Sequence, residues 1–155
     1  MNENYFKENE KNDLQLLYEF NEKYKLFDTI VPAKEKEQYD AIAWHGTRTF
    51  AVELKHRLIK LGKYKTLFIE SYKYLELKLE YEFNGMEGLY INFLHDAVVI
   101  FNINKIKHKP NFTIHNIKSD GYEVNQLQER RYHLDFRDAV IYKKENDTYK
   151  LIQKP

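Results

Sequence analysis

The sequence predicts a single α/β domain built on a mixed β-sheet. Apolar residues recur at helical spacing near the N-terminus, two short apolar runs flank a glycine-containing turn, and a second helical segment precedes further apolar runs. With 155 residues and 43% hydrophobic content, the chain can bury one good core but not two comfortably. We therefore expect residues 1–155 to form one domain.

The first expected element is an amphipathic helix from Asp13 to about Tyr24. The apolar side chains with this spacing are Leu14, Leu17, Tyr18 and Tyr24. Pro32 and the charged residues 34–37 then break the pattern and are interpreted as a solvated loop. The sheet is expected to begin at Tyr39.

A β-hairpin is predicted next. The runs from Tyr39 to Trp44 and from Thr49 to Lys55 are apolar, aromatic or β-branched. The polar segment 45–48 separates them and contains a glycine, which can adopt a positive φ. If the turn closes symmetrically on Gly46 and its neighbour, each strand residue has a defined partner.

The second half of the chain is expected to hold one more helix and several strands. Apolar spacing favours a helix over about residues 67–83, although alternating leucines there would also suit a strand. A second hairpin is expected from the apolar runs 89–94 and 97–103. The basic stretch 104–120 receives no assignment. Further strands are expected at residues 132–136, 139–142 and 148–152, the last two forming a return pair.

Charge and composition exclude several classes of protein. The formal net charge is only +1, so a nucleic-acid site would have to be local. The chain has no cysteine, which excludes disulfides, thiolate zinc sites and a thiol nucleophile, and favours a cytoplasmic location. No secretory signal and no membrane-spanning segment is recognisable. No phosphate-binding GxxxxGK or dinucleotide-binding GxGxxG string occurs.

The first hairpin carries the residues with the clearest chemistry. In the symmetric register Asp40 lies opposite Glu53, and the two-residue period of a strand puts Lys55 on the same face. Two carboxylates at such a short distance repel each other unless a cation lies between them. Oxygen ligands of this kind suit Mg²⁺ or Mn²⁺. The conservative interpretation is a weak surface pair, but the apolar neighbours predict a strand buried on both faces.

A metal ion at this position would support hydrolysis of a phosphodiester. It would lower the pKa of a bound water molecule and offset the charge of the transition state. Lys55 could orient the attacking water, neutralise developing charge, or act as a base after desolvation. The sequence leaves these three roles open.

At these residues the chain resembles the PD-(D/E)xK nucleases. The strings YDAIA at 39–43 and AVELK at 51–55 match the Asp and (D/E)xK motifs, with spacing similar to that of archaeal Holliday-junction resolvases. Tyr39 stands where the eponymous proline would be. The resemblance covers roughly residues 13–84. It implies a restriction-endonuclease-like core of helix, three-strand meander, helix and strand, with extra C-terminal strands here. It also implies Asp40, Glu53 and the main-chain carbonyl of Leu54 as metal ligands.

The resemblance suggests further site residues on the helices. Members of the superfamily often place an acidic residue of the first helix near the metal, and Glu19 is the best candidate here, followed by Glu22. Both would equally suit an exposed helix face. Some members carry a Gln or Glu four residues before a Tyr on the helix after the core motif, a spacing that Glu70 and Tyr74 match loosely.

Basic residues after the hairpin are candidate phosphate contacts. Acidic residues are missing from 54 to 68, whereas the same stretch is rich in cations. The candidates are Lys55, Arg57, Lys60, Lys63 and Lys65. An ordinary solvated loop would have a similar composition. A weaker second patch comprises Lys105, Lys107 and Lys109, and His45 and His56 are candidates by position alone.

The functional hypothesis is a Mg²⁺- or Mn²⁺-dependent nuclease that hydrolyses DNA, with Asp40, Glu53, Lys55 and Glu19 as its catalytic residues. The alternative is a noncatalytic nuclease-like fold that binds nucleic acid or a protein within a phage or mobile-element assembly. A structural domain without a nucleic-acid role is a third alternative. A homodimer is expected only by family analogy, because one small domain commonly needs a second copy to cut two strands.

Overall fold

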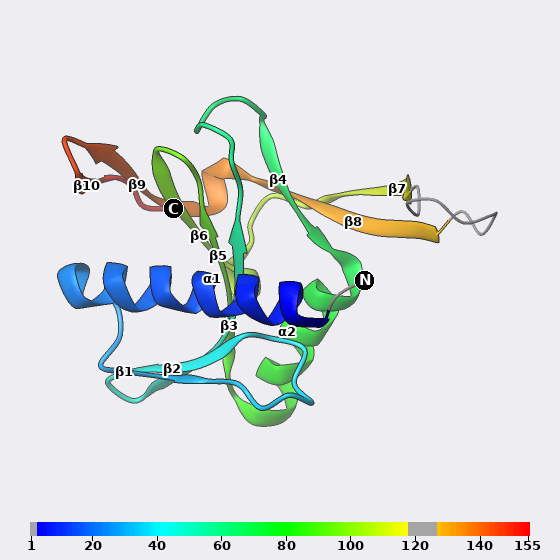
Figure 1. Ribbon diagram of the computed structural model, residues 1–155. Coiled ribbons are helices and arrows are strands. Elements are labelled where there is room, and N and C mark those ends of the chain that lie inside the picture. The colour runs from blue at the N-terminus through cyan, green and yellow to red at the C-terminus, as the bar shows by residue number, and fades with distance from the viewer. Residues whose placement is uncertain (1–2, 118–126) are drawn as a thin grey trace.

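A computed structural model describes residues 3–117 and 127–155 of the chain. Two sheets and two helices make up the fold (Figure 1). The helices are α1 (Glu3–Tyr24) and α2 (Ser71–Asn84). Neither helix combines the length and the apolar character that a membrane span requires over the residues described.

The larger sheet has seven strands in the order β1-β2-β3-β5-β6-β9-β10. These strands are β1 (Thr29–Pro32), β2 (Ala41–His45), β3 (Arg48–His56), β5 (Glu87–Phe93), β6 (Ala97–Asn102), β9 (Ala139–Glu145) and β10 (Thr148–Gln153). Only the β3–β5 pair is parallel, and α2 supplies its crossover. The sheet is therefore mixed, as predicted.

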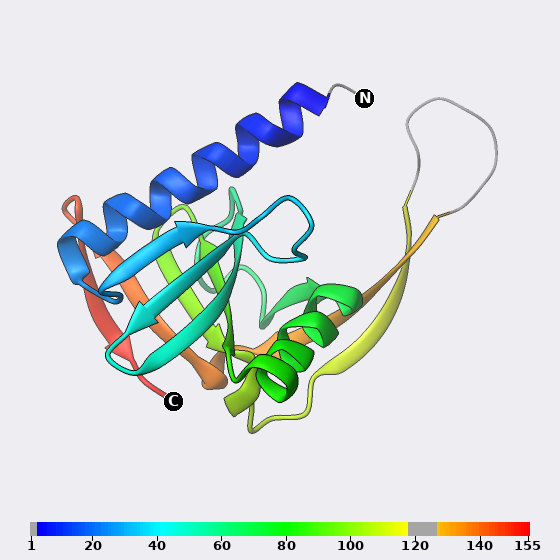
Figure 2. The ribbon, with the colours of Figure 1, turned by 90° about the horizontal axis from the view of Figure 1, so that it is seen from below.

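The two helices lie on opposite faces of this sheet (Figure 2). Leu17 and Phe20 of α1 pack with Val52 and Leu54 of β3. On the other face, Leu77 of α2 packs in the cluster that contains Ala51 and Tyr90. Alternate residues of β3 thus belong to different cores, which follows from the period of two along a strand. Glu53 lies on the α2 face.

The smaller sheet has three strands in the order β4-β8-β7. They are β4 (Thr66–Glu70), β7 (Asn111–Ile117) and β8 (Leu127–Asp135). Strands β7 and β8 extend together beyond the main body (Figures 1 and 2). Leu67 and Ile69 of β4 join Leu134 of β8 in the core beneath α2, which anchors this sheet. Two single-turn 3₁₀-helices, Ile103–Lys105 and Phe136–Asp138, complete the described elements.

Several sequence-based assignments are confirmed. The β2–β3 register pairs Trp44 with Thr49, as the symmetric turn predicted, and Gly46 has a φ of +58°. The second hairpin forms as β5 and β6, and β9 and β10 pair as expected. The C-terminus of α2 is capped by Gly85 in the left-handed conformation.

Other assignments need correction. Residues 34–37 lie outside the strands, as interpreted, but Pro32 is the last residue of a strand that was not expected. The sheet therefore begins ten residues earlier than expected from the residues alone, with strand β1. It supplies the first strand of the three-strand meander that the resemblance implied. The helix expected from about residue 67 begins at Ser71, because residues 66–70 form β4. The unassigned basic stretch contains β7. The first helix begins at Glu3 rather than Asp13.

Candidate active site

The end of the β2–β3 ladder brings the two motif carboxylates together. Asp40 lies one residue beyond the last pair, Ala41 with Val52, and its N–H donates to the Val52 carbonyl at 2.9 Å. Asp40 therefore does not continue the ladder directly opposite Glu53, which corrects the predicted pairing in detail. Its carboxylate instead accepts a hydrogen bond from the Leu54 N–H at 2.7 Å. That bond holds the Asp40 side chain beside β3.

Glu53 is a buried carboxyl group, with only 2% of its surface exposed. Burial and repulsion by Asp40 raise its pKa to about 8, although Lys73 acts in the opposite direction. Burial also raises the pKa of Asp40, against the effects of the Leu54 N–H, Lys73 and Lys55. Mutual repulsion in a poorly hydrated place is the situation that a cation relieves.

Two lysines lie on the same side of the sheet as this pair. Lys73, in the first turn of α2, forms an ion pair with Glu53 Oε1. Lys55 Nζ lies 3.7 Å from Glu70 Oε1. Burial alone would raise the pKa of Glu70, but the positive charges of Lys55, Lys73 and Arg57 lower it. The result is an alternating cluster of acidic and basic groups.

Lys73 was not among the residues singled out from the sequence. A detectable signal exists, however, because acidic residues are favoured in the first turn of a helix and α2 has none there. A lysine at that position is unfavourable for the helix alone. Its partner is Glu53 on the adjacent strand, which explains why the helix tolerates it.

The donor atoms around Asp40 and Glu53 fit a hard divalent cation. Glu53 Oε2 is buried and has no hydrogen-bond partner among the residues described. In a strand, the N–H and the carbonyl of one residue point to the same edge, so the Leu54 carbonyl lies on the edge of β3 that faces Asp40. The β2–β3 ladder ends before this position. Carboxylate and carbonyl oxygens are the ligands that Mg²⁺ and Mn²⁺ accept. Lys73 already places a positive charge beside Glu53.

A polar cavity of about 240 Å³ opens onto this pair. Glu53 and Lys73 line it together with Asp40 and other residues of the loop between β1 and β2. Residues 3–117 and 127–155 contain no group of three or more acidic or histidine side chains arranged to hold a metal ion. Asp40 and Glu53 could therefore supply two side-chain ligands to a metal ion, and the remaining positions would be left to the main chain, water or a phosphate.

The first helix does not bring its acidic residues to this cluster. Glu19 is exposed and accepts a hydrogen bond from Gln15 at 3.0 Å. It lines a hollow with Phe93 and Tyr149 on the α1 side of the sheet, whereas Glu53 faces α2. Glu22 is also exposed on α1. The structure thus separates both residues from the two carboxylates.

The second proposed pair on α2 is divided. Glu70 joins the cluster through Lys55, as described above. Tyr74 instead turns into the core, where its ring lies 4.6 Å from that of Tyr132, centroid to centroid. The i, i+4 relation does not hold for this pair, because Glu70 is the last residue of strand β4 and lies before α2.

The basic candidates do not form one patch. Arg57 is held by hydrogen bonds to Asn92, the Phe68 carbonyl and Tyr90, so its first role is structural. Lys65 lines a cavity with Arg57, whereas Lys60 lines a separate hollow beside Asp96. Lys63 is exposed and lies over Tyr64, with 5.5 Å between the ammonium and the ring centroid.

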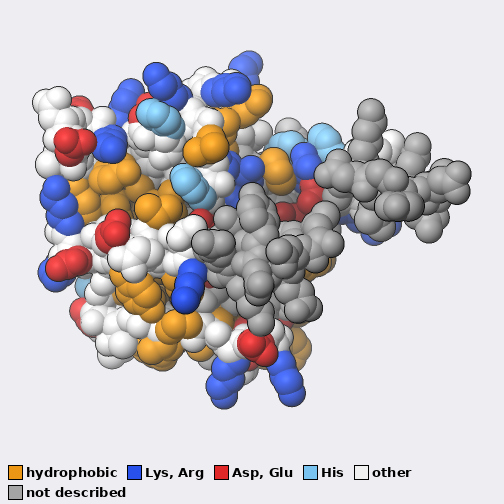
Figure 3. Space-filling view, in the orientation of Figure 1, with side chains coloured by type: hydrophobic (Ala, Val, Ile, Leu, Met, Phe, Trp, Pro, Cys, Tyr) orange, Lys and Arg blue, Asp and Glu red, His pale blue; other side chains and the backbone are white. Residues whose placement is uncertain are grey.

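The weaker candidates are placed elsewhere. Lys105 lies 3.8 Å from Glu87, and the Lys107 N–H donates to Asp138. Lys109 is exposed. His45 and His56 are both exposed, and His45 lies 3.7 Å from Asp28. On the face shown in Figure 3, charges of both signs are interspersed, consistent with a local rather than a global nucleic-acid site.

Comparison with solved structures finds a similar fold in Archaeoglobus fulgidus Hjc, a Holliday junction resolvase from an archaeal hyperthermophile. The similarity covers 80% of this chain and 84% of that one, with a TM-score of 0.51 and 13% sequence identity. This chain has a Holliday-junction-resolvase fold. The PD-(D/E)xK nuclease fold that the motif resemblance implied is confirmed. At this level of identity, the resolvase likeness concerns the fold alone. Neither protein families nor curated proteins give a match to the sequence.

Proposed function

We propose that this protein is a metal-dependent nuclease that hydrolyses phosphodiester bonds in DNA. The observation that carries the proposal is the buried pair of carboxylates, Asp40 and Glu53, at the open end of a hairpin and beside two lysines. The resolvase-like fold is consistent with this chemistry. Such a pair is costly to bury without a cation, so a stability requirement alone gives no reason for it.

In this proposal Asp40, Glu53 and the Leu54 carbonyl hold Mg²⁺ or Mn²⁺. The bound ion would supply an acidified water molecule and positive charge for the phosphodiester. The hydrogen bond from the Leu54 N–H fixes Asp40 for this task. Lys73 contacts the other oxygen of Glu53, Oε1, and its ammonium would be a further donor to a phosphate oxygen.

Lys55 is assigned the role of neutralising charge on the attacked phosphate. The Lys55 side chain is 37% exposed, so DNA can reach it. Glu70 lies 3.7 Å away and restricts the directions in which the Lys55 side chain can extend. Holding a cation in place before the substrate arrives is the main electrostatic contribution that a protein makes to such a reaction.

The decisive test is cleavage of supercoiled, linear, single-stranded and four-way-junction DNA in Mg²⁺, in Mn²⁺ and in chelator. Wild-type protein should cut in either metal and not in chelator. Asp40→Ala and Lys55→Ala should abolish cutting while retaining the fold. Glu19→Gln is the matched control, and it should retain activity because Glu19 lies on the other face of the sheet. Cutting by purified Asp40→Ala protein would refute the proposal.

One observation favours the noncatalytic alternative, a nuclease-like fold that serves as a binding component of a phage or mobile-element assembly. Glu53 already has a cationic partner in Lys73, and the described side chains supply only two metal ligands. Calorimetric titration separates the two functions. Binding of Mg²⁺ or Mn²⁺ that is lost in Glu53→Gln supports the nuclease, whereas no metal binding by the wild type supports the alternative.

We also propose that the protein acts as a homodimer through α2. Four exposed apolar side chains on this helix fall on one stripe, because their spacings of three and four residues match the helical repeat. They are Tyr72, Leu75, Leu79 and Phe83, with 56%, 49%, 44% and 79% of their surfaces exposed. A second copy offers the same apolar stripe, so a two-fold contact would cover both.

A further inference from the structure

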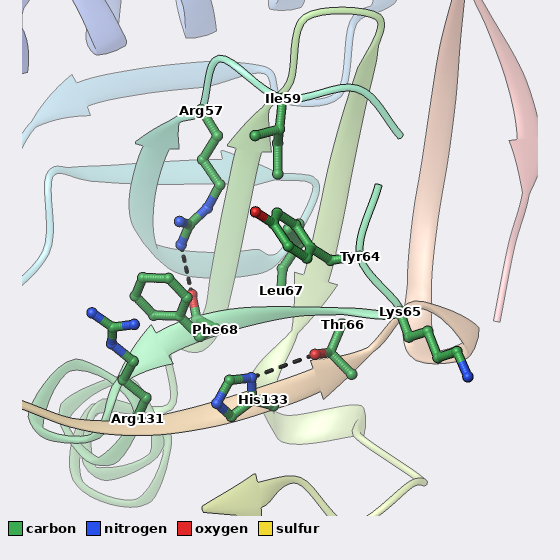
Figure 4. A pocket seen from close by; sticks show the side chains of 9 residues that line it. All are labelled: Arg57, Ile59, Tyr64, Lys65, Thr66, Leu67, Phe68, Arg131 and His133. Atoms are coloured by element: carbon green, nitrogen blue, oxygen red, sulfur yellow. Dashed lines mark hydrogen bonds between the residues drawn. The ribbon is translucent and has the colours of Figure 1, made fainter. Parts of the chain in front are cut away.

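A second cavity, distinct from the one at the two carboxylates, opens between β4, β8 and the loop that joins β3 to β4 (Figure 4). Its volume is about 550 Å³, within the range of small-molecule sites. Arg57, Lys65 and Arg131 line it together with His133, and none of the described lining residues is acidic. The remaining lining residues are Ile59, Tyr64, Thr66, Leu67 and Phe68. The cavity therefore combines cations with an apolar and aromatic surface.

Tyr64 is the aromatic side chain in this cavity that can accept a flat ring. Phe68 lies between two guanidinium groups, 4.3 Å from that of Arg57 and 3.9 Å from that of Arg131 to the ring centroid. Tyr64 is 55% exposed, and its ring faces the same space as Phe68 (Figure 4). Exposed aromatic rings beside arginines are the usual surface for stacking an unpaired base.

The two arginines and the histidine of the cavity are held in place before any ligand binds. Arg57 donates to Asn92 Oδ1 at 3.1 Å, to the Phe68 carbonyl at 2.7 Å and to the Tyr90 hydroxyl at 2.9 Å. Arg131 pairs with Glu129 and still lies over Phe68. The His133 ring contacts the hydroxyls of Thr66 and Thr113. Groups fixed in this way lose little entropy on binding.

The cavity lies next to the candidate active site. Arg57 follows Lys55 by two residues on the same side of the chain, a rise of about 6.6 Å along an extended segment. On β4, Phe68 and Glu70 have the same relation, and Glu70 is the partner of Lys55. Glu70 is also paired with Arg131 in the β4–β8 ladder. A strand that places one phosphate at Lys55 can therefore place its next nucleotide in the cavity.

We propose that this cavity binds one unpaired nucleotide adjacent to the cleaved bond, with its base against Tyr64 and its phosphate near Arg131. The inference rests on the proposed function and narrows its substrate to DNA with a single-stranded or branched segment. A continuous duplex keeps its bases stacked and paired, so it would present only phosphates and base edges to this surface and leave the Tyr64 ring uncovered.

The test uses binding in chelator, so that no cleavage is needed. Wild-type protein, Tyr64→Ala and the control Tyr81→Ala are titrated by fluorescence anisotropy with a single strand and with a duplex of the same sequence. Tyr81 is exposed on α2, away from the cavity. Tyr64→Ala should weaken single-strand binding by about tenfold or more and leave duplex binding within about twofold. Tyr64→Trp should restore it, and Tyr81→Ala should change neither.

A fluorescent base reports stacking directly. Fluorescence of a single strand that carries 2-aminopurine should be quenched by the wild type and less so by Tyr64→Ala. Equal losses on single strand and duplex, no loss, or displacement of the single strand by an acidic peptide at similar concentration would each overturn the proposal. If cleavage depends on Asp40 but single-strand binding does not depend on Tyr64, the proposed nucleotide site is rejected and the proposed nuclease activity is retained. If single-strand binding depends on Tyr64 but no DNA is cleaved, the proposed nuclease activity is rejected and the proposed nucleotide site is retained.

Discussion

Glu53 shows most clearly how one residue links the fold to the proposed chemistry. It is almost fully buried, one of its oxygens contacts Lys73, and the other has no partner among the residues described. A buried carboxyl group in this state is expensive in its charged form. The same arrangement that reduces the stability of the free protein leaves an oxygen available for a metal ion.

The stability of the metal-free protein should therefore depend on pH through Glu53. Burial and repulsion by Asp40 raise the folded-state pKa of Glu53 to about 8, above its ordinary value of 4.5. Between these values the folded protein holds a proton that the unfolded chain has released, so the free energy of unfolding decreases as pH rises. The limiting slope is about 1.4 kcal/mol per pH unit for one proton.

Urea unfolding in chelator at pH 5, 6, 7 and 8 measures this effect. Glu53→Gln should remove most of the decrease, because glutamine has no proton to lose. Mg²⁺ should stabilise the wild type at pH 8 but not the variant. Equal slopes for wild type and Glu53→Gln would show that the group does not titrate in this range.

Lys73 should compete with the metal ion for Glu53. Replacement by Met removes the positive charge and keeps most of the side-chain volume, so Mn²⁺ affinity should rise by about tenfold or more in calorimetric titration. Lys55→Met is the matched control, because Lys55 is paired with Glu70 instead. Unchanged Mn²⁺ affinity in Lys73→Met would show that the positive charge of Lys73 does not oppose metal binding.

At the level of elements, helix α2 decides what surrounds the two carboxylates. It begins directly after β4 and packs on the sheet face that carries Glu53. Its approach to β5 is close at Gly88, where an added Cβ would lie 2.7 Å from the Cβ of Leu77. The small residue therefore sets the distance between the helix and the sheet.

Gly88→Ala should destabilise the protein by about 1–3 kcal/mol, because both contact partners are in the packed core and one must move. Gly46→Ala is the control: its added Cβ meets nothing within 4 Å, and only the cost of a positive φ remains. Denaturant unfolding of both variants measures the difference. A Gly88→Ala protein as stable as the wild type would show that α2 can shift freely.

At the level of the whole molecule, the cavity at Asp40 and Glu53, the aromatic cavity and the apolar stripe of α2 involve the same strand–helix junction. Strand β4 contributes to the aromatic cavity, and α2 begins where β4 ends. Two copies that meet along α2 would therefore bring two active sites into one particle. That arrangement suits a substrate with two strands to be cut.

The proposed dimer predicts a change of oligomeric state when the stripe is charged. Leu75→Glu and Leu79→Glu should each shift the protein to a monomer in analytical ultracentrifugation, because a buried unpaired carboxylate is costly. Tyr81→Glu is the matched control, since Tyr81 is equally exposed but lies on the opposite side of the helix from the stripe. A wild-type protein that is monomeric at high concentration would contradict the proposed interface.

The sequence by itself determined the first hairpin and therefore the proximity of Asp40, Glu53 and Lys55. A turn of two residues fixes the register of its strands, and the period of two fixes the faces, so local information was sufficient. It also indicated α2 and the later hairpins, whose periodicity extends over several residues.

Only the tertiary structure decided which groups join this pair. Lys73 reaches Glu53 because α2 crosses over the sheet to allow the parallel β3–β5 pairing. Strand β4 is five residues long and pairs with β8, which lies some sixty residues later, so its own sequence could not distinguish it from the start of a helix. The placement of Glu19 on the far face and of Arg131 over Phe68 likewise depends on contacts between segments distant in sequence. Local patterns encode registers and faces, whereas packing between distant elements decides which faces meet.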